Sequence, residues 1–115
     1  MISGVHAIVF SRDADATRAF FRDVLELDSV DAGGGWLIFA LPPAEVAMHP
    51  SDGGSRHELY LMCDDVDATV EKLRAKGVAL ARAIADQGFG RVGYLDVPGI
   101  GELGIYEPHH PTPPR

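Results

Sequence analysis

One short motif occurs twice in this chain, and the repeat constrains the fold more than any other feature. Asp-Ala-Asp-Ala-Thr at positions 13–17 returns as Asp-Val-Asp-Ala-Thr at positions 65–69. Each copy follows an apolar run typical of a strand, at 4–10 and again at 59–63. Each copy also opens a stretch with helical spacing of apolar residues. Two copies of a strand–helix–strands unit in 115 residues predict two modules that share one core.

The first module is expected to contain one helix and four strands. Residues 4–10 are almost all apolar and rich in β-branched side chains, which is typical of a strand covered on both faces. Asp13 is a suitable N-cap for the helix that follows. The remaining strands of this module are expected at 26–32, 36–41 and 44–49, separated by three glycines at 33–35 and two prolines at 42–43.

The second module repeats this order after a linker, Pro-Ser-Asp-Gly-Gly-Ser-Arg, at 50–56. Asp65 is the expected N-cap and Gly77 the expected end of its helix. Its strands are expected at 57–63, 78–85, 91–96 and 102–106. The chain is thus predicted to be a single domain over 1–115, with module one at 4–50, module two at 57–108 and a tail at 109–115.

The order βαβββ, twice, predicts an α+β fold in which two modules pack as a pseudo-twofold pair around a shared cleft. A cleft between modules is a usual place for a small ligand. The chain should also form a homodimer, because paired modules leave sheet edges that a second copy can cover.

Composition excludes several classes of partner. The formal net charge of -7 argues against non-specific binding to nucleic acid. No apolar run approaches the ~18 residues of a membrane span, and no signal peptide precedes the first strand, so a cytoplasmic location is expected.

Cys63 is the only cysteine, which excludes an intramolecular disulfide, and its strand position is typical of a buried thiol.

Three segments carry a family resemblance. They are the first strand with its leading histidine and helix cap (6–13), the strand and helix of the second module (58–77), and the final hairpin with its Tyr-Glu-Pro ending (90–108). Together they resemble the vicinal oxygen chelate superfamily, which includes glyoxalase I, extradiol dioxygenases and bleomycin-binding proteins. The resemblance implies two βαβββ modules and a ligand cleft, but one fold hosts many functions.

In members of that superfamily that use a metal, four side chains from the first and fourth strands of the modules hold a divalent ion, which acts as a Lewis acid on the substrate. The resemblance places these four positions on His6, Ala47, Glu58 and Gly104. Alanine and glycine have no side chain that binds metal. The resemblance therefore implies no tightly bound cofactor, with a divalent metal possible at His6 and Glu58. Residues on the same strand faces that can replace the missing ligands are Glu45, His49 and Glu102.

Each candidate also has a purely structural interpretation. His6 in an apolar strand can be a hydrogen-bonded core histidine, and Glu58 a solvated carboxylate at a strand start. Glu102 can be an exposed strand end. Arg91 opens a strand, where it can meet an anionic group or simply face solvent.

Two functional hypotheses remain open. In the first, the protein is a metal-free binding module that sequesters or senses an organic metabolite or drug. In the second, it is a metal-dependent lyase, isomerase or dioxygenase on a small oxygenated substrate, with His6, Glu58 and Glu102 as catalytic candidates. The blank ligand positions favour binding. The expected ligand-binding residues are Trp36, Ala47, His49, Tyr60, Arg91, Gly104 and Tyr106.

Overall fold

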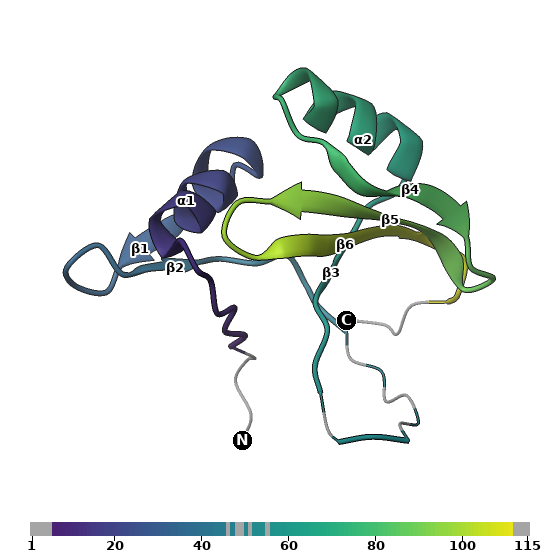
Figure 1. Ribbon diagram of the computed structural model, residues 1–115, viewed down its shortest axis with the longest axis horizontal. Helices are drawn as coiled ribbons and strands as arrows, with labels where there is room; N and C mark the ends of the chain where they lie inside the picture. The colour runs from purple at the N-terminus through teal and green to yellow at the C-terminus, as the bar shows by residue number, and fades with distance from the viewer. Residues whose placement is uncertain (1–5, 46, 48–49, 51, 55, 112–115) are drawn as a thin grey trace.

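The computed structural model describes residues 6–45, 47, 50, 52–54 and 56–111. Within them the chain forms a short helix α1 (Ala14–Ala19), which continues as a π-helical segment η1 (Phe20–Val24), and a longer helix α2 (Val66–Ala75) (Figure 1). None of the described helices is long and apolar enough to cross a bilayer. The strands are β1 (Ser29–Asp31), β2 (Leu37–Phe39), β3 (Tyr60–Met62), β4 (Leu80–Asp86), β5 (Gly90–Val97) and β6 (Gly101–Pro108).

The second module forms the predicted βαβββ unit. Its four strands lie in the order β3-β6-β5-β4, with β3 parallel to β6 and the other pairs antiparallel. Helix α2 crosses from β3 to β4 and covers one face of the sheet (Figure 1). The α+β class predicted from the sequence is therefore confirmed.

The repeated motif forms the same cap at both helix starts. The Asp13 carboxylate accepts a hydrogen bond from the Ala16 amide at 3.1 Å, and the Asp65 carboxylate accepts one from Ala68 at 3.0 Å. The threonine that ends each copy has its hydroxyl within hydrogen-bond distance of the backbone carbonyl of the capping aspartate, at 3.1 Å for Thr17 and 2.8 Å for Thr69. Each motif thus satisfies donors that a helix start leaves free, which explains why the sequence repeats there.

One core joins the two modules. Helix α2 contributes Val66, Val70 and Leu73, which pack against apolar side chains of β5 and β6. Phe20 and Phe21 of η1 belong to the same buried cluster. The first helix is also tied to the turn between β5 and β6, because the Arg12 amide donates to the Gly99 carbonyl at 2.9 Å.

The first module departs from the prediction. Residues 6–10 of the strand expected at 4–10 form no strand, and Ile8 and Phe10 are exposed over 66% and 89% of their surface. Only β1 and β2 pair, as an isolated two-stranded sheet. Residues 44, 45 and 47 of the strand expected at 44–49 form none, and the others lie outside the described residues. A strand forms only where a neighbour pairs with it, and no described strand pairs with residues 6–10, 44, 45 or 47.

Candidate functional site

Three tyrosines gather on the face of the β3-β6-β5-β4 sheet opposite α2. Tyr60 of β3, Gly104 of β6 and Tyr94 of β5 lie in one row across the sheet. The rings of Tyr60 and Tyr94 lie edge to face, with centroids 6.2 Å apart. Tyr106 continues the group along β6, 5.8 Å from Tyr60. Tyr60, Tyr94 and Tyr106 are called the tyrosine face below.

Gly104 is the residue that makes this arrangement possible. A Cβ atom at this position would collide with the ring of Tyr60. A blank ligand position at Gly104 implies open space in the predicted cleft. The structure contradicts this, since the Tyr60 ring already occupies the space and any side chain at Gly104 must displace it.

Hydrogen bonds order the hydroxyls at one end of the tyrosine face. The Tyr60 hydroxyl donates to Glu58 Oε2 at 3.0 Å and lies 3.3 Å from the hydroxyl of Tyr94, which can donate to it in turn. The hydrogen bond with Tyr94, burial and the Glu58 carboxylate together raise the pKa of Tyr60 well above its ordinary value. Tyr60 therefore acts as a neutral hydrogen-bonding group, not as a phenolate.

A second polar group lies at the other end, around Tyr106. Its hydroxyl is 3.2 Å from His110 Nε2 and 3.5 Å from Glu45 Oε1. Burial is the main cause that raises the pKa of Tyr106, and Glu45 adds to it. Phe89, from the turn between β4 and β5, packs its ring 5.9 Å from that of Tyr106. The tyrosine face is thus an aromatic surface with hydroxyls, carboxylates and an imidazole along its margins.

Arg82 of β4 lies over the tyrosine face from the side. Its guanidinium is 3.6 Å from the ring centroid of Tyr94, which is cation–π geometry, and 2.9 Å from the Glu102 carboxylate. Glu102, a catalytic candidate from the sequence, is therefore held by an arginine. Sequence reasoning did not single out Arg82, Phe89, Tyr94 or His110. The alternation of side chains along β5 was the one available signal for Tyr94.

The other predicted site residues do not join this group. His6 and Ala47 are exposed, and His6 makes no hydrogen bond or ion pair with any described residue. Trp36, exposed over 60% of its surface, stacks with Arg18 at 5.3 Å beside the two-stranded sheet. Arg91 binds Asp67 of α2 through two 3.0 Å contacts, which places it toward the helix. His49 lies outside the described residues. The functional roles of these residues stay predictions.

The described residues do not fit a metal centre. They contain no group of three or more histidine, cysteine, aspartate or glutamate side chains close enough to share an ion. Glu58 is engaged by the Tyr60 hydroxyl and by Arg56 at 3.7 Å. The ring of Tyr60 covers the position at Gly104 where the resemblance expects a fourth ligand.

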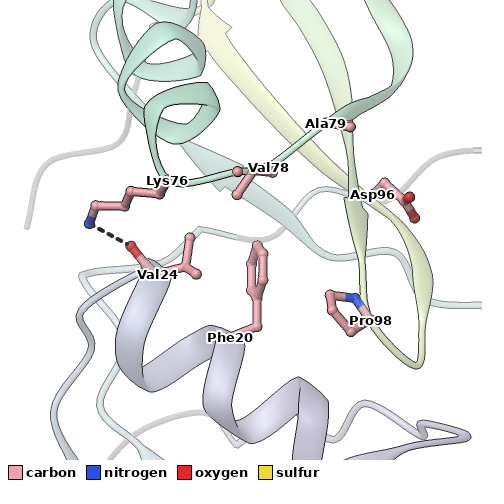
Figure 2. A pocket seen from close by; sticks show the side chains of 8 residues that line it. Phe20, Val24, Lys76, Val78, Ala79, Asp96 and Pro98 are labelled. Atoms are coloured by element: carbon pink, nitrogen blue, oxygen red, sulfur yellow. Dashed lines mark hydrogen bonds between the residues drawn. The ribbon is translucent and has the colours of Figure 1, made fainter.

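Two hollows lie on the helix side of the molecule, away from the tyrosine face. The smaller, of about 300 Å³, is lined by Phe20, Val24, Lys76, Gly77, Val78, Ala79, Asp96 and Pro98. Figure 2 shows how Lys76 extends from the end of α2 toward Val24, whose carbonyl accepts its hydrogen bond at 3.1 Å. The larger, of about 620 Å³, lies between α2, β3 and the chain that follows η1. No tyrosine lines either hollow.

A family model agrees with this βαβββ geometry. The model of the glyoxalase/bleomycin resistance protein/dioxygenase superfamily matches residues 4–110. The chain belongs to this superfamily. The resemblance read from three sequence segments is thereby confirmed, and the glyoxalase-like fold is established for nearly the whole chain.

Three solved structures resemble the chain over almost its full length. TnmS3, an antibiotic binding protein from Streptomyces sp. CB03234, is 27% identical with a TM-score of 0.67, over 93% of this chain and 97% of that one. Lactoylglutathione lyase from Agrobacterium tumefaciens is 17% identical with a TM-score of 0.64, over 91% and 93%. A superfamily member from Sphaerobacter thermophilus is 18% identical with a TM-score of 0.63, over 91% and 97%. The last two support the fold alone. No curated protein matches the chain.

The raised pKa of Tyr60 predicts an alkaline effect on stability. The folded state favours its neutral phenol, so this contribution is complete below the ordinary tyrosine pKa of about 10 and is lost as the pH rises above it. Tyr60→Phe should make the free energy of unfolding fall less steeply above that pH, as measured by urea denaturation at several pH values. Equal slopes for the two proteins would contradict the assigned environment of Tyr60.

Proposed function

We propose that this superfamily member binds a flat organic metabolite or drug on its tyrosine face and holds it without chemical change. One observation carries the proposal: the Tyr60 ring lies over Gly104, where the resemblance places a metal ligand. Aromatic surface thus replaces a donor group at that position. A flat ligand can stack against the faces and edges of the tyrosine rings. The hydroxyls and carboxylates at the margin of the tyrosine face can fix the orientation of that ligand. The antibiotic-binding neighbour at 27% identity supports this reading.

The test is binding of two fluorescent flat compounds, doxorubicin and acridine orange. Tyr94→Ala removes a ring from the tyrosine face and should weaken binding about fivefold to tenfold, the usual value of an aromatic contact. Tyr94→Phe keeps the ring, so its affinity should stay close to that of the native protein. Fluorescence titration measures all three proteins. The proposal fails if neither compound binds, or if Tyr94→Ala binds as well as Tyr94→Phe.

Recovery of the ligand distinguishes binding from catalysis. If the protein sequesters its ligand, mass spectrometry after long incubation should recover each compound unchanged. A product that forms only with the native protein would favour the enzymatic alternative, in which Glu58 or His6 acts on the substrate.

Binding should need no divalent metal. The described residues offer no three-ligand set, so dialysis against EDTA is expected to leave the affinity for doxorubicin unchanged within error. Elemental analysis of protein purified without a histidine tag should find less than stoichiometric zinc, nickel, iron or manganese. A stoichiometric metal that survives dialysis and disappears in His6→Ala would overturn this expectation.

The functional form proposed here is a homodimer in the cytoplasm. The apolar segment 6–10 is exposed and pairs with no strand among the described residues, and β3 forms one edge of its sheet. Exposed apolar segments and open sheet edges are surfaces that proteins usually cover. A second copy can cover both, because each chain presents the same pair of surfaces.

A further inference from the structure

The larger hollow has the volume and lining expected of a second binding site. It is called the helix-side groove here and lies on the face of the sheet opposite the tyrosines. Its lining is mostly aliphatic and comes from four segments: 24–27, 41–42, 61–63 with Ile105, and one side of α2 from Thr69 to Lys76. Its volume of about 620 Å³ lies within the range of small-molecule sites.

The charge at the groove is unusual for this protein. The chain has a net charge of -7 and contains only two lysines, Lys72 and Lys76, and both line the groove. They stand four residues apart, Lys72 within α2 and Lys76 as its C-cap, and therefore lie on one side of the helix. The only acidic side chain in the lining is Glu26. An acidic protein thus places both lysines beside one apolar hollow.

The two lysines differ in their contacts. Lys76 donates to the Val24 carbonyl at 3.1 Å (Figure 2). It also pairs with Glu26 at 3.4 Å, and the two contacts fix its side chain beside the groove. Lys72 is exposed and makes no hydrogen bond or ion pair with any described residue. Its ammonium is therefore available to an anion, while Lys76 holds the groove walls together.

We propose that the helix-side groove binds a small amphipathic anion, with its carboxylate at Lys72 and its apolar body along Leu61, Leu73 and Ile105. Charge selects the class of ligand, because an ammonium attracts an anion and offers no acceptor to a cation. The aliphatic lining provides the larger part of the binding energy through burial of apolar surface. This site is separate from the tyrosine face, so the proposal of an anion site does not depend on the function proposed for the tyrosine face.

Isothermal titration calorimetry with three ligands of equal chain length tests the charge requirement. Decanoate should bind the native protein about tenfold more tightly than decanol, since a hydrogen bond to a charged group contributes about that factor. Decyltrimethylammonium should bind more weakly than decanol. Equal affinities for decanoate and decanol, or no binding of decanoate, would overturn the proposal.

Matched substitutions on α2 locate the site. Lys72→Met keeps the aliphatic chain and removes the charge, so it should abolish the preference for decanoate over decanol. Arg74→Met removes a cation that pairs with Glu71 and does not line the groove, and it should leave binding unchanged. Ala75→Trp should block the groove. Tyr94→Ala should leave the affinity for decanoate unchanged. Weaker binding by this variant would indicate that decanoate binds at the tyrosine face and would contradict the proposal.

Cys63 supplies an independent readout. It is the only cysteine in the chain, it lines the groove, and burial raises its pKa, so its reaction with N-ethylmaleimide should be slow. Decanoate should slow the reaction further in the native protein and in Arg74→Met, but not in Ala75→Trp. Labelling of the native protein at one rate with and without decanoate would exclude occupation of this groove.

Discussion

Phe10→Asp is expected to convert the protein from a dimer to a monomer. Phe10 is exposed over 89% of its surface in the single chain, and Ile8 on the same apolar segment over 66%. In the proposed homodimer a second copy covers this segment, so an aspartate would place an unpaired carboxylate in an apolar interface. That costs several kcal/mol, and the dimer should weaken by about a hundredfold or more.

Light scattering over a range of protein concentrations measures this effect. The native protein should have twice the 12.3 kDa mass of one chain at high micromolar concentration, and Phe10→Asp should have the mass of one chain. Phe10→Leu keeps an apolar side chain and should remain dimeric. A native protein that scatters as a monomer would exclude the homodimer, and a dimeric Phe10→Asp would exclude this segment from its interface.

Features that depend on neighbouring residues could be read from the sequence. The caps at Asp13 and Asp65 each bond an amide three residues further on, so residue type and order were enough to predict them. Gly77 was predicted to end α2, and its φ of +87° is one that glycine adopts without strain. The repeat of these local signals also indicated the number and order of the modules.

Features that depend on pairing between distant strands could not be read in this way. The tyrosine face exists because β3 lies parallel to β6 with Tyr60 opposite Gly104, and no local pattern fixes that register. For the same reason the sequence left Gly104 as a blank ligand position and did not single out Tyr94. His110 follows the last strand and resembled a frayed tail, yet the structure places it against Tyr106.

The segment predicted as the first strand shows a second limit of prediction from the sequence. The apolar run at 4–10 was predicted to form a strand covered on both faces, but its described residues, 6–10, form no strand and are exposed. The apolar pattern of a segment indicates that the segment needs burial. It does not indicate whether the same chain or a second copy buries that segment. The proposed dimer is the physical resolution of that mismatch.

Gly99→Ala is expected to destabilise the protein more than other glycine substitutions in the same turn. Gly99 has a φ of +85°, which strains any side chain, and its added Cβ would lie 2.8 Å from both the Asp13 carbonyl oxygen and Thr17 Oγ1. The Thr17 hydroxyl is buried and lies 2.6 Å from the Pro98 carbonyl, to which it donates. Relief of the clash must therefore break the contact between α1 and the β5–β6 turn. We expect a loss of about 3–5 kcal/mol from strain and overpacking combined.

Gly101→Ala is the matched control. Gly101 lies two residues further along the chain with a φ of +80°, but an added Cβ there meets no atom within 4 Å. It should cost only the backbone strain, about 1–2 kcal/mol. Urea denaturation at one fixed protein concentration compares the free energies of unfolding, since dimerisation would otherwise contribute to them. Equal losses in the two variants would mean that the close approach of Gly99 to α1 adds nothing to stability.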